Sequence, residues 1–528
     1  MGARGPVTKV TIVGGGTAGW MAAAVLSQRL SKVQITLIES EEIGTVGVGE
    51  ATIPHIRNYL ALAGIDPLQM IRETKATFKL GIQFVDWGAP GERYIHGFGK
   101  IGRDMLWLHP HQLWAAARER APGSVQHFDH YSLNCVAALQ NRFAFPDPRN
   151  PNSPLADIDY AYHFDASLFA RFLRAESEQR GVNRIEGRIV EVIRNSRDGF
   201  VERVRLQDGR EVGGELFVDC SGMRALLIGD ALGIGYDHWK QWLLCDRAIA
   251  VPTAPVTPLT SYTRSIAGRA GWQWRIPLQH RIGNGYVFSS DLLSDDRAAE
   301  ILLANLDSEP TADPRPVSFA PGRRLKAWEK NVVAIGLSSG FLEPLESTSI
   351  HLIQTAIQRL LATFPSDGFS QPDIDEYNRQ SRFEYEDVRD FIIAHYKVTR
   401  RAGDPFWDHV REMEIPESLT ERLELFRSSG RFFKHWAQEL FAEESWVQVL
   451  IGQGFEMNPD PVTHFVPTEE ISGFLSDIAE VIAETAATMP DHADFIAELL
   501  AGVAERASAA PAAIMASTVK FTLESARR

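Results

Sequence analysis

The sequence predicts an α/β protein: a Rossmann-like nucleotide-binding fold with mixed sheets, followed by a mainly helical C-terminal part. Residues 9–13 have the pattern of a buried strand. A glycine-rich turn follows, and residues 17–30 carry apolar side chains at helical spacing before a second strand at 33–38. Residues 184–218 contain short strands broken at two Asp-Gly pairs, which predicts antiparallel hairpins. From about residue 373 onward the pattern is mostly helical.

The remaining elements follow from local periodicity and from turn residues. Residues 77–84 alternate between apolar and polar side chains, with Lys79 on the polar side, which predicts one strand with a single buried face. Further expected elements are a Pro/Asn-rich loop at 146–154, a helix at 168–180, a strand at 332–335, a helix at 350–364, and two amphipathic helices at 468–489 and 491–507.

The composition narrows the class of protein. The 528 residues carry 54 Lys and Arg against 68 Asp and Glu, a formal charge of −14, and an acidic surface repels nucleic-acid phosphates. No run of 18 apolar residues predicts a membrane span, and the N-terminus has no secretion signal. Cys135, Cys220 and Cys245 form neither a metal-binding spacing nor a disulfide framework. We therefore expect a cytoplasmic protein of at least two subdomains, with no metal, nucleic-acid or membrane partner.

The glycine-rich turn carries a dinucleotide-binding fingerprint. Gly14, Gly16 and Gly19 have the spacing G-x-G-x-x-G between a strand and a helix, and Glu39 ends the next strand 20 residues after Gly19. The glycines permit close approach of a pyrophosphate to the helix N-terminus, and the carboxylate can accept a hydrogen bond from a ribose hydroxyl.

Two distant segments decide between NAD and FAD. Residues 217–222 form a strand that ends in Asp219 before a glycine, and residues 332–340 form a strand that ends in a Gly336-Leu337 turn. Three strand-to-loop elements spread over more than 300 residues resemble the flavoprotein monooxygenase superfamily, in which several parts of the chain contact an extended FAD. The resemblance therefore favours FAD.

Further motifs narrow the resemblance. They are GGGTAGW at 14–20, GVGEATIP at 47–54, WQWRIP at 272–277 and FLEPLESTSI at 341–350, together with Lys79. With these motifs the chain, up to about residue 465, resembles the flavin-dependent tryptophan halogenase family. The resemblance implies an enzyme in which a separate NAD(P)H-dependent flavin reductase supplies reduced FAD. Oxygen and chloride or bromide then give hypohalous acid, which reaches a lysine beside a small aromatic substrate.

The resemblance also implies a division of the chain and a set of cofactor contacts. Residues 1–370 would form the FAD-binding subdomain, with embedded substrate-site strands, and residues 371–528 a helical subdomain that covers the substrate. The expected FAD-contacting residues are Gly14, Gly16, Thr17, Ala18, Gly19, Glu39, Gly49, Glu50, Ala51, Val190, Asp219, Gly336, Leu337 and Ile350.

Lys79 and Glu346 are the expected catalytic residues. A lysine ammonium can donate a hydrogen bond to hypohalous acid and make it more electrophilic, whereas a neutral, desolvated lysine could form a haloamine. The sequence leaves both alternatives open. A carboxylate near the lysine could orient the acid or take the proton that leaves the ring. The other interpretation of Glu346 is a helix N-terminal glutamate that interacts with the helix dipole.

The resemblance places the halide at Thr348 and Ser349, where a helix N-terminus offers backbone N–H groups to an anion. Many relatives have glycine at the second position, and a backbone contact should survive that change. In the family, residues matching Trp272 and Trp274 keep the substrate away from the flavin. Simple core packing is the alternative for two tryptophans at strand spacing.

The substrate is expected beside His96 and Phe98, which match the positions that sandwich an indole ring in the family. An ordinary loop is the alternative. Enzymes acting on free tryptophan commonly have a tyrosine pair where this chain has Trp446 and Val447. Because Val447 has no hydroxyl group, we expect an indole without the amino-acid group, or a larger indolic or phenolic compound. Glu346 favours a free substrate over a carrier-bound one.

Two other functions remain open from the sequence. An FAD-dependent aromatic hydroxylase would share the fold but would not need halide, and a catalytically idle flavin-binding scaffold would show neither activity. The oligomeric state is also open between a monomer and a homodimer.

Overall fold

The computed structural model describes residues 5–41 and 49–509, with side chains up to residue 502. Over these residues the strands are β1 Lys9–Val13, β2 Gln34–Glu39, β3 Gly49–Ala51, β4 Thr77–Lys79, β5 Gly81–Val85, β6 Arg93–Gly97, β7 Ala161–Asp165, β8 Asn183–Glu186, β9 Ile189–Arg194, β10 Val201–Leu206, β11 Glu211–Gly213, β12 Leu216–Asp219, β13 Tyr236–His238, β14 Arg247–Thr253, β15 Thr263–Gly268, β16 Gly271–Pro277, β17 Ile282–Phe288, β18 Arg315–Ser318, β19 Gly322–Arg324, β20 Trp328–Glu329, β21 Val332–Ala334 and β22 Gly340–Phe341.

The α-helices of the described residues are α1 Thr17–Arg29, α2 Ile56–Ala63, α3 Pro67–Thr74, α4 Pro110–Arg120, α5 Leu133–Leu139, α6 Ala166–Gln179, α7 Asp295–Ala304, α8 Ser349–Ala362, α9 Gln371–Lys397, α10 Pro405–Glu412, α11 Glu417–Ser429, α12 Glu443–Gly452, α13 Thr468–Thr488 and α14 His492–Ala509. None of them is long and apolar enough to cross a membrane. The two helices expected near the C-terminus are confirmed as α13 and α14.

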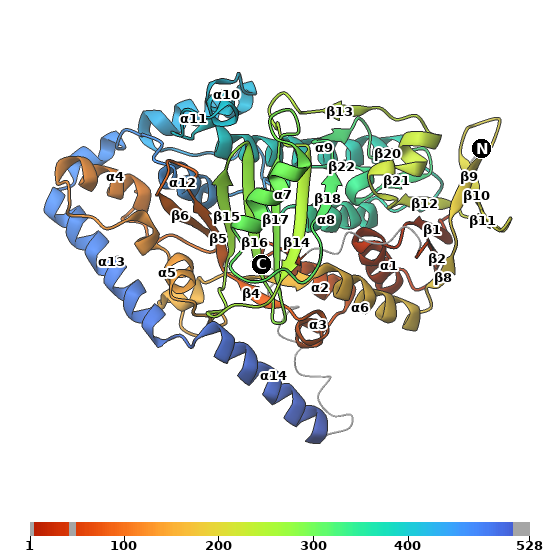
Figure 1. The fold of residues 1–528 in the computed structure, drawn as a ribbon, viewed down its shortest axis with the longest axis horizontal. Coiled ribbons are helices and arrows are strands. Elements are labelled where there is room, and N and C mark those ends of the chain that lie inside the picture. Colours follow the sequence, from red (N-terminus) through yellow and green to blue (C-terminus); the bar gives the residue numbers. More distant parts are fainter. Residues whose placement is uncertain (1–4, 42–48, 510–528) are drawn as a thin grey trace.

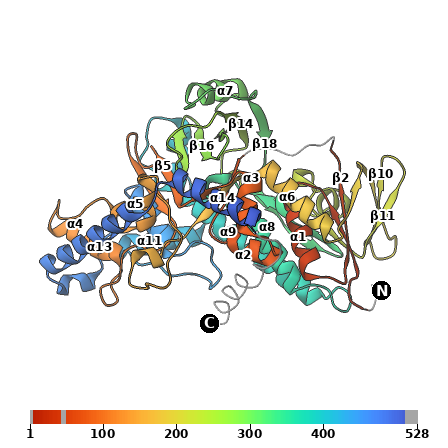
Figure 2. The same ribbon diagram turned by 90° about the horizontal axis from the view of Figure 1, so that it is seen from below.

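Three regions follow one another along the molecule (Figure 1). A six-stranded sheet, in the order β20-β21-β12-β1-β2-β8, lies at one end with α1 and α6 beside it. A seven-stranded sheet, in the order β18-β14-β17-β16-β15-β5-β6, occupies the middle. Helices α4, α11 and α13 lie at the far end, and Figure 2 shows the same succession from below. The predicted α/β architecture with mixed sheets is confirmed.

The six-stranded sheet contains the predicted strand–helix–strand opening. β1 lies between β2 and β12, and both neighbours run parallel to it. The predicted hairpins are confirmed for β9, β10 and β11, which form a separate antiparallel sheet. The outer strands of the 184–218 region, β8 and β12, instead join the parallel sheet beside β2 and β1.

The expectation of one strand with a single buried face at residues 77–84 is wrong. The segment forms two strands that belong to different sheets: β4 pairs with β7, and β5 pairs with β6 and β15. Both faces are covered, so Lys79 and Gln83 are buried as well as the apolar residues. The alternation of residue types shows which side chains are polar, but it cannot show that a second layer covers the polar side.

One large hydrophobic core joins the seven-stranded sheet to the helical region. It includes Trp272 of β16, Phe391 of α9, Trp407 of α10 and Phe426 of α11. A second core lies around α1, α2 and α6. Because the first core contains residues from both sides of position 370, the division of the chain at that residue stays a prediction.

Candidate active site

The glycine loop joins β1 to α1 as predicted. Gly14 has a φ of +109°, and a Cβ there would lie 2.2 Å from the carbonyl oxygen of Cys220, so the turn requires glycine. α1 begins at Thr17 with Gly16 as its N-cap, and among the described residues no side chain caps this first turn. Its N–H groups and the positive end of the helix dipole suit a pyrophosphate. The loop therefore fits a dinucleotide cofactor.

Glu39 lies at the end of β2, against the glycine loop. A Cβ on Gly15 would lie 1.6 Å from Glu39 Oε2. Trp20 Nε1 donates a hydrogen bond to Oε2 at 3.2 Å, and Arg184 Nε donates one to Oε1 at 2.5 Å. These contacts fix the carboxylate next to the loop, where a contact with the ribose of a dinucleotide would be made.

The two distant segments meet the glycine loop. The turn after β12 touches Gly14 through Cys220, and Gly336, directly after Ile335, has a φ of +76° and would place a Cβ 2.8 Å from Ala18 Cβ. The Asp219 carboxylate is buried and accepts two hydrogen bonds from backbone N–H groups eight and nine residues later. Asp219 therefore shapes its turn.

The remaining residues expected at the cofactor lie on four elements: Gly49, Glu50 and Ala51 on β3, Val190 on β9, Leu337 in the turn after β21, and Ile350 in α8. Burial raises the pKa of the Glu50 carboxyl to about 7. Val190 is exposed on the antiparallel β9–β11 sheet, so its assignment rests on the family resemblance alone. Gly47 and Val48 of the same motif lie outside the described residues.

Lys79 is a fully buried lysine at the end of β4, with no exposed surface. Its Nζ donates hydrogen bonds to the carbonyl oxygen of Thr52 at 3.0 Å and to Ser347 Oγ at 2.9 Å. The same nitrogen lies 5.3 Å from the ring centroid of Phe98. Burial lowers the pKa of Lys79 to about 7, although the nearby charge of Glu346 opposes this shift. The lysine is therefore close to its midpoint of protonation at neutral pH.

Glu346 lies in a short 3-10 helix, Pro344–Glu346, directly before the turn to α8. It is buried, and its carboxylate accepts hydrogen bonds from His96 Nδ1 at 2.9 Å and from His395 Nε2 at 2.7 Å. Burial alone would raise the pKa of this carboxyl, but the two histidines outweigh burial and lower it to about 2. Glu346 is therefore ionised at neutral pH.

His395 is a residue that the sequence did not single out, because no motif surrounds it. The histidine lies in α9 with no exposed surface, and its Nδ1 is 2.8 Å from the carbonyl oxygen of Phe391. A carbonyl oxygen only accepts, so Nδ1 carries a proton. The other nitrogen faces Glu346, so one further proton is shared between this nitrogen and the carboxylate. Because Glu346 is ionised, this proton lies on His395, and the pair is an imidazolium and a carboxylate.

The predicted halide residues lie at the N-terminus of α8. The helix begins at Ser349 after Thr348, and Ser347 before them has a φ of +57°. Thr348 is buried, and its Oγ1 has no hydrogen-bond partner among the described residues. No side chain of the described chain caps the helix. An unpartnered hydroxyl beside uncapped N–H groups fits a small anion.

The three predicted substrate residues have different immediate neighbours. His96 is buried and engaged by Glu346, with Phe391 edge-on at 5.8 Å, whereas Phe98 faces the Lys79 ammonium. Trp446 is buried in α12, 4.8 Å from Phe391, and its indole N–H has no partner among the described residues. His96 and Phe98 thus border the lysine and glutamate, and Trp446 contacts this group through Phe391.

Trp272 and Trp274 lie side by side on β16, with ring centroids 6.2 Å apart, and both are buried. Trp272 Nε1 donates to Glu343 Oε2 at 2.9 Å, and Tyr396 donates its hydroxyl to the same oxygen at 2.7 Å. Burial raises the pKa of Glu343 to about 7. Both packing and separation of substrate from flavin agree with this position, so the role of the tryptophans stays a prediction.

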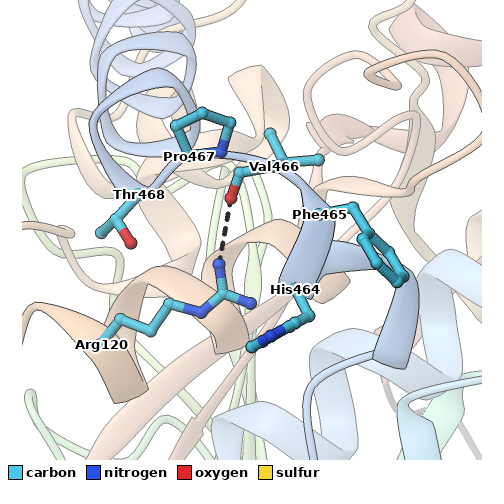
Figure 3. A pocket seen from close by; sticks show the side chains of 6 residues that line it. All are labelled: Arg120, His464, Phe465, Val466, Pro467 and Thr468. Atoms are coloured by element: carbon cyan, nitrogen blue, oxygen red, sulfur yellow. Dashed lines mark hydrogen bonds between the residues drawn. The ribbon is translucent and has the colours of Figure 1, made fainter.

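Two surface depressions lie away from these groups. One, of about 370 Å³, is lined by Arg120 and residues 464–468, and Arg120 Nη1 donates to Val466 O across it at 3.2 Å (Figure 3). The other, of about 250 Å³, borders α12 and includes Glu443 and Val447. Neither depression is lined by a residue predicted for the cofactor, halide, substrate or catalysis.

Comparison with known proteins gives a consistent family. A family model described as tryptophan halogenase matches residues 9–468. A tryptophan 6-halogenase from Streptomyces albogriseolus is 33% identical in an alignment of 500 positions that covers 87% of this chain and 92% of that protein.

Solved structures agree with the family model. A flavin-dependent halogenase from Xanthomonas campestris is 48% identical with a TM-score of 0.90, covering 94% of this chain and 98% of that one. Another, from Brevundimonas sp. BAL3, is 46% identical with a TM-score of 0.89, covering 93% and 99% of the two chains.

Proposed function

Because this chain belongs to the tryptophan halogenase family, we propose that it replaces a ring hydrogen of a free indole or tryptophan-like compound with chlorine or bromine. Its relatives are flavin-dependent halogenases, and the chain is an enzyme of that class. The alternative of an aromatic hydroxylase is not favoured by these relatives. The overall change at the ring is Ar–H plus HOX giving Ar–X and water.

The glycine loop is the proposed place of FAD. Gly14, Gly16 and Gly19 would let the pyrophosphate lie against the first turn of α1, with Glu39 beside the ribose. When bound in its reduced form, FAD would supply two of the four electrons that oxygen takes up, and halide would supply the other two as it becomes hypohalous acid. A separate NAD(P)H-dependent flavin reductase would supply the reduced cofactor.

The observation that carries the proposal is the enclosed Lys79 ammonium. Its nitrogen is anchored by Thr52 O and Ser347 Oγ and lies over the Phe98 ring. An ammonium so held can present a hydrogen bond to the oxygen of hypohalous acid, while Phe98 supports an aromatic ring nearby. Hydrogen bonding makes the halogen more electrophilic toward that ring.

Glu346 would hold a fixed negative charge opposite this lysine. The charge counteracts the desolvation that lowers the lysine pKa, and the carboxylate can accept the proton that leaves the halogenated ring. A carboxylate with a pKa of about 2 is a sufficient base for this step, because a ring cation is a strong acid.

The N-terminus of α8 is the proposed halide site. Thr348 and Ser349 would contact chloride or bromide through backbone N–H groups, with the unpartnered Thr348 hydroxyl as a further donor. His96, Phe98 and Trp446 are proposed to border the aromatic substrate. We also propose a cytoplasmic location, which the three free, buried cysteines support.

The experiment is a halide-dependent turnover assay. The protein is incubated with a flavin reductase, NADH, FAD, oxygen, indole and bromide, and products are identified by mass spectrometry. Bromoindole that forms only with bromide is the expected result. Hydroxyindole that forms without halide would overturn the proposal, as would the absence of halogenated product across a broad panel of free indoles and phenols.

A further inference from the structure

The last helices of the chain lie beyond the residues that the family model matches, which end at 468. α13 runs along the outside of the molecule, and α14 continues in nearly the same direction and contacts α3 (Figure 1, Figure 2). Within α14, His492 has no exposed surface although it is the first residue of the helix. A surface helix that begins with a fully buried histidine needs a structural reason.

β4, the strand that carries Lys79, is an edge strand. It lies at one side of the three-stranded sheet β3-β7-β4, so only β7 pairs with it inside that sheet. The backbone N–H of Phe78 points away from β7 and donates a hydrogen bond to His492 Nε2 at 3.1 Å. His492 thus accepts the hydrogen bond that a further strand would otherwise accept from the Phe78 N–H.

The hydrogen bonds fix the protonation of His492. Because Nε2 accepts from a backbone N–H, Nδ1 carries the proton and donates it to the Leu259 carbonyl oxygen at 3.2 Å. Burial agrees with this neutral state, since it lowers the pKa of His492 to about 4 although the hydrogen bond to Leu259 and the charge of Asp491 oppose this shift. The bond to β4 is therefore present throughout the neutral pH range.

Packing around this bond is aromatic. The Phe78 ring stacks on Phe143 at 4.0 Å and meets Phe495 of α14 edge-on at 5.6 Å. The backbone N–H of His492 donates to Asn141 O at 2.8 Å, and that of Phe143 donates to Pro490 O at 3.1 Å. The start of α14 is thus fastened to the same group of side chains that encloses Phe78.

Phe78 directly precedes Lys79, whose nitrogen is placed between two oxygen atoms of other segments. We propose that His492 is a positioning residue for Lys79, through which α14 holds the free edge of β4. This inference rests on the proposed role of Lys79 as the residue that directs hypohalous acid. Without the acceptor, the Phe78 N–H would be buried and unpaired, and β4 would shift to find another partner. A displacement of about 1 Å at a reacting group can cost about a hundredfold in rate.

The matched variants are His492→Phe and His492→Gln. Phenylalanine keeps a ring in the aromatic group but offers no acceptor, whereas the glutamine side-chain oxygen can accept from Phe78 N–H. With indole and bromide, and a β-diketone scavenger in the solution, we expect His492→Phe to lower kcat for bromoindole about tenfold or more. Bromination of the scavenger should rise correspondingly, while the Kd for FAD and the total oxidised bromide stay within about twofold of the wild type. His492→Gln should restore most of the transfer to indole.

If the ratio of bromoindole to brominated scavenger were the same in His492→Phe and in the wild type, the inference would be overturned. A parallel loss of FAD binding, oxidised bromide and bromoindole in both variants would overturn it too, because that pattern means general unfolding. If the His492→Phe variant does not fold, the Phe495→Ala variant tests the inference in its place. It removes a packing contact of the same helix but neither partner of the hydrogen bond. The inference requires that this variant also shifts bromine to the scavenger and speeds hydrogen exchange of the Phe78 amide. If the wild-type protein itself made no bromoindole, that result would contradict the proposed function rather than the role of His492.

Discussion

Lys79 is held so that its charge state depends on its surroundings. Its nitrogen has two oxygen partners, Thr52 O and Ser347 Oγ, no exposed surface, and a nearby anion in Glu346. Desolvation disfavours the ammonium, whereas the carboxylate and the two hydrogen bonds favour it. The balance places the pKa of Lys79 at about 7, where a modest change in the site alters the protonated fraction.

The pH dependence of halogenation distinguishes the two chemistries open to Lys79. Its folded pKa is depressed, so the ammonium is lost as the pH rises through about 7. If the ammonium donates a hydrogen bond to hypohalous acid, as proposed, kcat for bromoindole falls up to about tenfold per pH unit above 7. A haloamine route needs the neutral amine, so kcat would rise over the same range. Single-turnover rates with reduced FAD between pH 6 and 9 check this.

The Glu346→Gln variant tests whether the fall in kcat above pH 7, the falling limb of the pH profile, is due to Lys79. Removing the anion leaves desolvation unopposed, so the pKa of Lys79 should fall and the falling limb should move to lower pH. Glu50 and Glu343 also have pKa values raised to about 7 by burial. Glu343→Gln is therefore the matched control, and a limb that moves with Glu343 rather than Glu346 would contradict the assignment.

His395→Gln tests the positioning of the Glu346 carboxylate. Glutamine can still donate one hydrogen bond but cannot carry the shared positive charge, so the carboxylate loses part of what keeps it ionised. A hydrogen bond to a charged group contributes about 1.5–3 kcal/mol, so we expect kcat to fall about ten- to a hundredfold. FAD titration should give an unchanged Kd. An unchanged kcat would show that the carboxylate does not depend on His395.

At the residue scale the sequence predicted part of the site. Glu346 was predicted from its motif, and Lys79 from its place on a strand between aromatic residues and from the family resemblance. Both side chains are buried, and the charge of Glu346 influences the pKa of Lys79, but their catalytic roles stay predictions. His395 and Tyr396 could not be found, because they come from the long helix α9, where buried polar residues resemble a solvated helical face. His96 was expected to face a substrate ring, and the structure adds that its Nδ1 is engaged by Glu346.

At the scale of elements, the turns after β1, β12 and β21 meet at the proposed cofactor site. These three strands run parallel to one another in one sheet, so their carboxyl ends lie at the same edge and their turns meet. Glycines made these turns recognisable from sequence. The split of residues 77–84 into β4 and β5 was not recognisable, because both strands keep the alternation and change sheets at Leu80.

Gly16→Ala is the sharpest test of these turns. A Cβ on Gly16 meets no protein atom within 4 Å, and its φ of −73° suits alanine. The apo protein should therefore keep its Tm. The new methyl group would occupy the approach of the pyrophosphate, so the Kd for FAD, measured by flavin fluorescence, should rise at least about tenfold.

Gly473→Ala is the matched control, since a Cβ there also meets nothing within 4 Å, and α13 lies far from the glycine loop along the molecule. It should change neither Tm nor FAD affinity by much. If Gly16→Ala bound FAD as tightly as Gly473→Ala does, the cofactor would not lie on this loop.

At the scale of the whole molecule, the proposed cofactor loop and the strand of Lys79 belong to different sheets. The glycine loop belongs to the six-stranded sheet at one end, whereas β4 lies in a small sheet next to the seven-stranded one. The proposed oxidation of halide and its use on the ring therefore depend on different parts of the chain. Because the proposed reductase would supply only the reduced cofactor, FAD reduced by light should support bromination as well as the reductase does. Product requiring the reductase protein itself would contradict this.

The most direct test of the account is the fate of oxidised bromide in Lys79→Met. The variant keeps a long apolar side chain in β4 but has no nitrogen. Reactions contain reduced FAD, oxygen, bromide, indole and a β-diketone scavenger, and both brominated products are quantified. The account predicts that bromoindole falls at least about a hundredfold while the total oxidised bromide is retained and appears on the scavenger. Undiminished bromoindole, or loss of oxidised bromide together with FAD binding, would contradict it.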